Sequence, residues 1–498
     1  MPKLTFLKRF DLEVIAFTSG ASVMTVELVG SRLVAPFLGG SLVVWTTLIG
    51  VILACLSLGY TIGGRLADKQ PSRLILAVVM AGAGLLIAAV NWQIALVASF
   101  SSLMIDSFGL EFASILSALF LFALPSILLG MIPPYAIKLR LTSTGQTGKV
   151  AGNLYAISTV GSIVGTFLTG FWWVPTFGSS ATLFGVSLAL LIIGFLFLAS
   201  SRFLPYSLMI ILVASAAFFY EPNFYFNRDS IKNFYESRYS TFFLLEGTDS
   251  ETNRPVLQIL TSRYVAQSGR FLDGDDLLFP YTRFFDHIFD LNPETDKVLM
   301  IGGGAFTYPN RFAAIHPDKV IEVVEIDPFL TELAQKHFNL ELRDNLIIHN
   351  QDGRLFLNNN EKKYDAVLLD AFSSAGSVPF QLATTEAVEM IYDSLNDNGV
   401  VIVNVIGATE GKYARFVEAQ FAVYQEVFGQ AIAYPLKTKI KENEGEGKDL
   451  INIMIVAIKN PDEANKEQSL EQESYTPNPA RVLTDDWAPV DYYVSGIL

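Results

Sequence analysis

A glycine turn followed by an acid marks the part of this sequence best suited to bind a nucleoside. Gly302, Gly303 and Gly304 come directly after a short apolar run in the second half of the chain. Glycine there lets the backbone turn sharply and approach a ligand without an intervening side chain. Glu325 ends the next apolar run about 20 residues later, where an acid accepts hydrogen bonds from ribose hydroxyls. The combination of turn and acid indicates a nucleoside site.

Three more acids follow apolar runs of the same region: Asp327, Asp352, which precedes Gly353, and Asp370. The carboxyl ends of parallel strands meet at one edge of a sheet, where ligands bind in folds of this kind. Four acids at successive strand ends therefore predict one crevice rather than scattered surface charge. Helix N-capping or loop solvation would explain Glu325, Asp352 or Asp370 singly, but not their shared placement.

The pattern of apolar runs predicts the elements that must position these residues. From residue 297 a strand, a turn and a helix repeat, with strands expected at 297–301, 320–325, 346–349 and 366–369 and helices near 311–315 and 329–338. This order implies a doubly wound α/β core of the Rossmann-like type. Before it, short alternating runs at 238–245, 255–260 and 264–267 predict a small antiparallel sheet.

The first half of the chain is too apolar for an ordinary soluble domain. The 498 residues are 51% hydrophobic and 17% charged, with a mean hydropathy of +0.38, and charges are sparse before residue 221. A transmembrane helix needs about 20 largely apolar residues. The stretches that qualify are 12–36, 42–63, 73–92, 112–137, 150–174, 179–200 and 203–220. We therefore expect a multi-pass α-helical membrane domain, whose first stretch lacks a signal-peptide cleavage site.

Lysines and arginines in alternate short loops predict the orientation of this domain. They precede the first stretch and follow the second, fourth and sixth, while the loops between hold none, which places the N-terminus in the cytoplasm. The loop 64–73 resembles the cytoplasmic loop between the second and third helices of major facilitator transporters. An odd number of crossings would leave the C-terminal half outside the cell, unless 203–220 does not fully cross.

Charge and residue usage exclude several classes of function. The formal net charge of -14 argues against nucleic-acid binding, which needs clustered lysine and arginine, and an acidic surface suits a cationic substrate. Cys55 is the single cysteine, so there is no internal disulfide, and with four histidines a zinc site is not expected. In the apolar half, Gly161, Gly165 and Gly170 are expected to allow close packing of helices.

Four motifs in this order carry a resemblance to a known family: 301–304, 324–328, 352–354 and 364–370. Over roughly residues 235–435 the sequence resembles the spermidine synthase (polyamine aminopropyltransferase) family. The strings 370–374, 379–380 and 483–489 look like its membrane-fused branch, which has an N-terminal transporter-like helical domain. The expected domains are a transmembrane helical domain at 1–220, a small β-sheet domain at 221–290, and an α/β Rossmann-like, methyltransferase-type domain at 291–498.

The resemblance also implies an activity. Members of the family transfer the aminopropyl group of decarboxylated S-adenosylmethionine, which is a co-substrate, to putrescine. By position in the motifs, Glu325 would bind the ribose and Asp352 the adenine amino group. Asp370 would act as the base on the amine nucleophile.

Further residues of the substrate site follow from the same resemblance. Gln267 and Tyr281 resemble the residues that line the family's amine pocket, and the three glycines, Asp327 and Gly353 would complete the binding site. No cofactor is implied. The expected partners are polyamine and nucleoside substrates and the lipid bilayer but no nucleic acid, and a homo-oligomer is an open possibility.

Two departures from the family pattern leave other functions open. Ala305 and Phe306 follow the glycines where the family has Asp-Gly-Gly, and Ser373 stands where a further acid is expected. Both acids would have contacted the aminopropyl amine or the acceptor. The alternatives are an S-adenosylmethionine-dependent methyltransferase, and a polyamine transporter or sensor with a degenerate nucleoside-binding domain. Because the donor derives from a cytosolic metabolite, we expect the catalytic domain of this cell-membrane protein in the cytoplasm.

Overall fold

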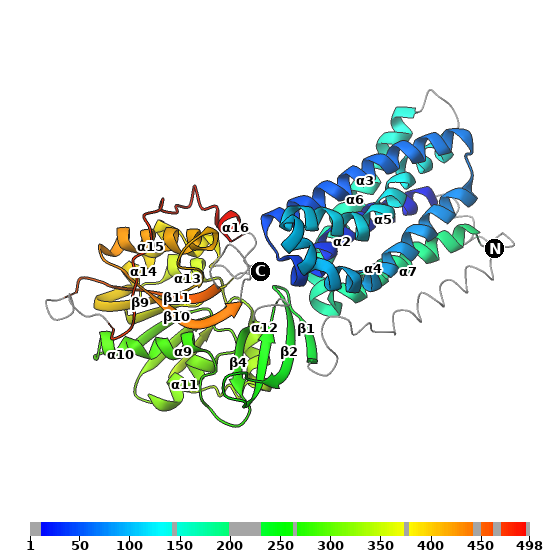
Figure 1. The fold of residues 1–498 in the computed structure, drawn as a ribbon. Helices are drawn as coiled ribbons and strands as arrows, with labels where there is room; N and C mark the ends of the chain where they lie inside the picture. The colour runs from blue at the N-terminus through cyan, green and yellow to red at the C-terminus, as the bar shows by residue number, and fades with distance from the viewer. Residues whose placement is uncertain are drawn as a thin grey trace. The chain divides into compact units, whose positions relative to one another are not determined.

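The chain forms two compact units, which Figure 1 shows as a helical bundle and an α/β domain. The computed structural model describes residues 11–141, 147–198, 231–261, 266–372, 378–441, 450–461 and 470–494. The first unit comprises Met1–Arg228 with Glu236–Thr241, and the second comprises Asp229–Tyr235 with Phe242–Leu498. The expected stretch 203–220 and the residue Ser373 lie outside the described residues. The domain boundaries expected at residues 220 and 290 stay predictions.

The first unit is built from long apolar helices, as the hydropathy predicted. They are α2 (Asp11–Leu38), α3 (Leu42–Lys69), α4 (Arg73–Phe108), α5 (Leu110–Arg140), α6 (Thr147–Leu168), the π-helical turn η2 (Thr169–Trp173) and α7 (Val174–Leu198). Within the described residues, five helices are long and apolar enough to cross a membrane. The fifth, Thr147–Leu196, runs for 50 residues but is non-helical at Gly178, whose φ is 80°. This break falls between the stretches 150–174 and 179–200 that the sequence predicted as separate helices.

Ion pairs gather the charges of the helix ends at one end of the bundle. Arg140 at the end of α5 pairs with Glu13 at the start of α2 (2.8 Å). Lys138 of α5 pairs in the same region with Asp68 at the end of α3 (2.6 Å). Among the described residues, Lys138 and Arg140 therefore lie beside the acids of neighbouring helix ends, and the side of the membrane that this end faces stays a prediction.

Small residues let the backbones of α2 and α6 approach each other closely. A Cβ atom added to Gly161 would lie 2.1 Å from the carbonyl oxygen of Phe17, and one added to Gly165 would lie 2.7 Å from the Cα of Ala21. Both glycines thus serve the close packing predicted from sequence. The same prediction is wrong for Gly170, where a Cβ would meet no described atom within 4 Å.

The second unit begins with a small four-stranded sheet. Its strands are β1 (Ile231–Glu236), β2 (Thr241–Thr248), β3 (Pro255–Leu260) and β4 (Ala266–Phe271), hydrogen-bonded in that order. The pairs β2–β3 and β3–β4 are antiparallel, as expected. The bounds of β3 match the prediction, whereas β2 and β4 end later than predicted and β1 was missed, because its polar residues hide the alternation.

The main sheet has seven strands in the order β10-β11-β9-β8-β5-β6-β7. The strands are β5 (Lys297–Ile301), β6 (Val320–Val324), β7 (Leu346–His349), β8 (Tyr364–Leu369), β9 (Leu395–Gly407), β10 (Ile432–Lys441) and β11 (Leu450–Ile458). The pairs from β7 to β9 are parallel, and β11 joins β9 antiparallel. The chain moves outward from β5 through β6 to β7, then returns to β8 on the other side of β5. Ligands bind at such a reversal point, at the carboxyl ends of the strands.

Alternating apolar residues of the parallel strands pack into two hydrophobic cores, one on each face of the sheet. Leu299 and Leu369 point to the face covered by α13 (Gly353–Asn359), α14 (Thr385–Ser394) and α15 (Arg415–Phe428). Met300 and Leu368 point to the face covered by α9 (Pro280–Phe284), α10 (Ile288–Leu291), α11 (Thr307–Ile315) and α12 (Pro328–His337) (Figure 1). Burial on both faces is what makes these strands continuous apolar runs in the sequence. The unit also contains the short helical turns η3 (Phe285–His287), η4 (Phe380–Leu382), η5 (Lys412–Ala414) and α16 (Val490–Tyr493).

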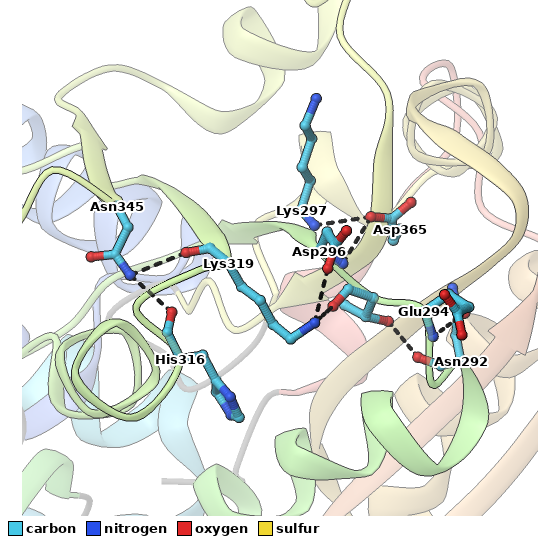
Figure 2. A network of polar contacts seen from close by, with 9 residues as sticks. Asn292, Glu294, Asp296, Lys297, His316, Lys319, Asn345 and Asp365 are labelled. Carbon is cyan, nitrogen blue, oxygen red and sulfur yellow. Dashed lines mark hydrogen bonds and ion pairs between the residues drawn. The ribbon is translucent and has the colours of Figure 1, made fainter.

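A polar network ties together the amino ends of the strands, opposite the predicted site (Figure 2). The carboxylate of Asp365 accepts hydrogen bonds from the backbone N–H groups of Asp296 (3.0 Å) and Lys297 (2.9 Å). Lys319 Nζ donates to Asp296 (2.9 Å), and the Asn345 amide donates to the carbonyl of Lys319 (3.1 Å). Asp365 belongs to a motif that carried the family resemblance, and its place here is structural: it fixes β8 beside β5.

We expect Gly161→Ala to destabilise the helical unit and Gly170→Ala to leave it unchanged. The first adds a Cβ within 2.1 Å of Phe17, so α2 and α6 must separate, which costs about 1–3 kcal/mol for overpacking of this kind. The second adds a Cβ that meets no described atom. Thermal unfolding of the full-length protein in detergent should show a lower Tm for Gly161→Ala alone. Equal Tm values for the two variants would contradict this account of the α2–α6 contact.

Candidate active site

The register of the sheet brings the predicted residues to one edge. Ile301 pairs with Val324 on one side and with Leu369 on the other, so the residues that follow these three leave the sheet side by side. These residues are Gly302, Glu325 and Asp370. Three of the predicted residues therefore lie side by side where β5, β6 and β8 end.

Gly302 is required by both its backbone conformation and its neighbour. Its φ is 96°, a region that L side chains rarely adopt, and a Cβ there would lie 2.4 Å from the carbonyl oxygen of Asp370. The turn after β5 thus lies directly against the backbone after β8. Any side chain at this position would push the turn away from Asp370.

Glu325 holds the glycine turn with its carboxylate. One oxygen accepts hydrogen bonds from the N–H groups of Gly303 (2.9 Å) and Gly304 (3.2 Å), and the other accepts from the N–H of Asp327 (2.9 Å). Burial raises the pKa of Glu325, and these three bonds oppose the rise. A carboxylate has about four acceptor positions. Three are used by the backbone, so about one is left for a ligand hydroxyl.

Two of the predicted acids cap helices. Asp327 is buried and accepts from the N–H of Phe329 at the start of α12 (3.1 Å), while Asp352 accepts from the N–H of Leu355 in α13 (2.9 Å). N-capping, the simpler explanation for such acids, therefore applies to both. Gly353 allows the start of α13 to approach β5, because a Cβ there would lie 2.8 Å from Ile301 Cγ2. The substrate contacts expected of these three residues stay predictions.

Asp370 is a partly exposed carboxyl at the end of β8 with a buried amide beside it. The Asn404 Nδ2 group, in β9, donates to Asp370 Oδ1 at 2.9 Å, and Asn404 is only 1% exposed. Burial raises the pKa of Asp370 to about 7; the negative charge of Glu325 adds to the rise, and the Asn404 hydrogen bond opposes it. A carboxyl that titrates near neutral pH can take up and release a proton, as a general base must.

Tyr281 and Gln267 are in contact with each other, from α9 and from β4 of the small sheet. Tyr281, in α9, donates its hydroxyl to the backbone carbonyl of Gln267 (3.4 Å). Burial, with the negative charge of Asp370, raises the pKa of Tyr281 well above its usual value, so this phenol stays protonated. The side-chain oxygen Oε1 of Gln267 is buried and has no hydrogen-bond partner among the described residues. Such an acceptor calls for a ligand or water with N–H or O–H groups.

Two of the positions that depart from the family pattern, Ala305 and Phe306, are apolar and lie at the end of the glycine turn. Ala305 and Phe306 are buried, and the Ala305 N–H donates to the hydroxyl of Ser268 in β4 (3.3 Å). Phe306 has a φ of 57°, uncommon for a residue with a large side chain, and its ring lies against Gly303. Residue 305 itself offers no carboxylate to a cationic group, because it is alanine.

Sequence reasoning missed Ser268 and Asn404. Asn404 had a signal, since it interrupts the otherwise apolar run 400–406, where a buried amide needs partners. Ser268 had none, because its contact with residue 305 depends on how the small sheet packs. Ile326 is a third residue that the sequence did not single out. It is apolar and 38% exposed although it stands between the buried acids Glu325 and Asp327. The described residues contain no cluster of three or more acids, histidines or cysteines able to hold a metal ion.

Comparison with known families and proteins relates this arrangement to enzymes of known class. Residues 278–428 match the spermine/spermidine synthase domain. The polyamine aminopropyltransferase of Vibrio vulnificus (strain CMCP6) is 26% identical over 213 residues, which are 42% of this chain and 65% of that protein. The probable polyamine aminopropyl transferase of Bifidobacterium longum (strain NCC 2705) is 32% identical over 139 residues, 28% of this chain and 30% of that protein.

A methyltransferase is also among the relatives. The eEF1A lysine and N-terminal methyltransferase of Xenopus laevis is 28% identical over 145 residues, which are 27% of this chain and 21% of that protein. The chain thus spans less than two thirds of the length of each of these three relatives.

We expect Asp370→Asn to raise the stability of the protein above pH 7. The folded-state pKa of Asp370 is about 7, above the usual value of about 4, so near neutral pH the folded state retains a proton that the unfolded state has lost. Stability is therefore lost as the pH rises from about 4 toward 7, by about 1.4 kcal/mol per pH unit. The neutral amide avoids this loss.

The measurement is Tm at pH 8 and at pH 5. Asp370→Asn should exceed the parent protein by several degrees at pH 8, and the difference should shrink at pH 5. Asp393→Asn, at an exposed position of α14, serves as the control and should show no pH-dependent gain. A gain for Asp370→Asn of the same size at both pH values would not fit a carboxyl whose pKa is raised in the folded state.

Proposed function

We propose that this chain, whose C-terminal part carries a spermine/spermidine synthase domain, is a membrane-anchored aminopropyltransferase. It transfers the aminopropyl group of decarboxylated S-adenosylmethionine to putrescine or a related amine. The observation that carries the proposal is Asp370, a carboxyl with a pKa of about 7 directly beside the glycine turn. A nucleoside held by the turn would present its sulfonium group next to a base.

The proposed reaction is a single displacement. Asp370 takes a proton from the acceptor amine, whose nitrogen lone pair then attacks the aminopropyl carbon bonded to sulfur. The carbon–nitrogen bond forms as the carbon–sulfur bond breaks, and the electron pair returns to sulfur, leaving a neutral thioether nucleoside. Because sulfonium is already a good leaving group, proximity and a deprotonated amine suffice, with no covalent enzyme intermediate.

Each wall of the site has a role in this proposal. Glu325 and the glycine turn hold the ribose side of the donor, and Asp352 meets the adenine amino group. The protonated hydroxyl of Tyr281 and the unpartnered Oε1 of Gln267 contact the acceptor amine. Acidic groups around the crevice suit a substrate that carries two positive charges.

One observation favours a second candidate, an S-adenosylmethionine-dependent methyltransferase. The glycine turn and Glu325 would hold either nucleoside, and Ala305 gives the donor's amine no carboxylate to bind. The similarity to a methyltransferase of Xenopus laevis points the same way. Calorimetry with the carboxylated and the decarboxylated nucleoside separates the candidates: a methyltransferase should prefer the carboxylated form.

We expect the purified full-length protein to convert putrescine and decarboxylated S-adenosylmethionine into a longer polyamine, detected by mass spectrometry. Asp370→Asn should reduce turnover about 10²–10⁴-fold, the usual contribution of a general base, with nucleoside affinity retained. Glu325→Gln should instead weaken the affinity for the nucleoside, by at most a few kcal/mol, since a charged hydrogen bond contributes about 1.5–3 kcal/mol. Nearly full turnover by Asp370→Asn would remove the base from the proposal, and unchanged affinity of Glu325→Gln would remove the ribose ligand.

We also propose that the catalytic domain and the N-terminus lie in the cytoplasm. If both parts of Thr147–Leu196 cross the membrane on either side of the break at Gly178, and the stretch 203–220 does not fully cross, the chain crosses an even number of times before the catalytic domain. An even number returns the chain to the side from which it started. This side would hold the lysine- and arginine-rich loops and the supply of the donor nucleoside.

Cysteine labelling of intact cells tests this orientation. In a Cys55→Ser background, single cysteines at the exposed positions Glu361 and Gln70 should resist an impermeant maleimide. A cysteine at Phe108, at the exposed end of α4, should be labelled. Labelling at 361 as strong as at 108 would place the catalytic domain outside.

A further inference from the structure

Two buried or partly buried amides form a chain that ends on Asp370. Asn404 Nδ2 donates to Asp370 Oδ1 at 2.9 Å, and Asn452 Nδ2 donates to Asn404 Oδ1 at 2.8 Å. Asn404 lies in β9 and Asn452 in β11, the neighbouring antiparallel strand. Asn404 interrupts the apolar run 400–406 of β9, and Asn452 interrupts the otherwise apolar β11.

The two bonds run in one direction, from Asn452 through Asn404 to Asp370. An amide has one acceptor end and one donor end, and it can turn over to present either. Asn452 donates to the oxygen of Asn404, so the oxygen is turned toward β11 and the NH2 group toward Asp370. Asp370 is therefore met by a donor, which favours its ionised form over its protonated form.

We propose that Asn452 is a positioning residue that, through Asn404, locks Asp370 as a hydrogen-bond acceptor and so keeps it ready to take a proton from the substrate. This inference rests on the proposed function of Asp370 as the base. Without Asn452, the Asn404 amide is free to turn over and accept a hydrogen bond from protonated Asp370. The proton would then be held by the enzyme instead of being exchanged.

The other ionisable groups that face Asp370 within the described residues are Glu325, after β6, and Tyr281, in α9. Both are held by partners outside β11: Glu325 by the glycine turn and Tyr281 by the backbone of Gln267. Replacing Asn452 should leave their contacts in place. A change in the titration of Asp370 in such a variant therefore reports on the amide chain.

Infrared titration tests the inference without any need for turnover. The carbonyl stretch of protonated Asp370 is isolated as the difference between the full-length protein and its Asp370→Asn variant, and its midpoint is followed with pH. Asn452→Leu removes the donor at similar volume, Asn452→Ala removes it with less bulk, and Asn452→Gln retains an amide. Asn396→Leu is the matched control, because Asn396 donates to Asp365 (2.7 Å) at the opposite end of the same strands.

The midpoint should rise by about one pH unit in Asn452→Leu and Asn452→Ala, as expected for a lost or reversed hydrogen bond to a charge. Asn452→Gln should restore part of the shift, and Asn396→Leu should cause none. Asn404→Leu should raise the midpoint at least as far, and adding Asn452→Leu to it should raise it no further. The acid limb of the kcat profile should move with the midpoint while KM is retained.

Two results would overturn the inference: an unchanged midpoint in both truncated variants, or an equal additional shift when Asn404 is already leucine. These results are distinct from a failure of the proposed function. A protein that makes no aminopropyl product but shows the expected shifts would retain the locked carboxyl and lose only the reaction assigned to it.

Discussion

The buried carboxylate of Glu325 is the interaction on which the rest of the site depends. It receives the N–H groups of Gly303, Gly304 and Asp327, and so joins the turn after β5 to the start of α12. The turn it shapes is the surface that the proposed function assigns to the nucleoside. Its negative charge also adds to the raised pKa of Asp370, two strands away in the sheet. One carboxylate therefore holds the glycine turn and also raises the pKa of the carboxyl proposed as the base.

Much of this arrangement could be predicted from sequence, because strands buried on both faces leave continuous apolar runs with clear ends. The bounds of β5 and β7 match those predicted, and Glu325 and Asp370 stand at one edge as expected. The sequence alone shows that acids follow the ends of the strands. Only the parallel register shows that these acids lie level with one another.

The sequence could not say how each acid is used. Asp327 and Asp352 follow strands as Glu325 does, yet both cap the helices that begin beside them. Asp365 lies in the motif 364–370, which also contains Asp370, but its carboxylate accepts hydrogen bonds from backbone N–H groups at the opposite end of β8. Residue type and spacing place a carboxylate at an element's end, and only the neighbouring N–H groups decide whether it is free for a ligand.

The amide chain shows the same limit at longer range. Asn452 pairs across the sheet with Ile406, two residues from Asn404, so the two side chains are diagonal neighbours on adjacent strands. They are 48 positions apart in sequence, and a register shift of one residue would turn Asn452 to the other face.

The same sheet explains how a titrating carboxyl can stand where Asp370 does. The preceding residues Leu368 and Leu369 are fully buried in opposite cores, so β8 is anchored by apolar contacts on both faces and the side chain that follows it can remain partly desolvated. The apolar contacts of the sheet core thus offset the free energy that desolvation of Asp370 costs. The result is a carboxyl whose pKa is close to neutral pH.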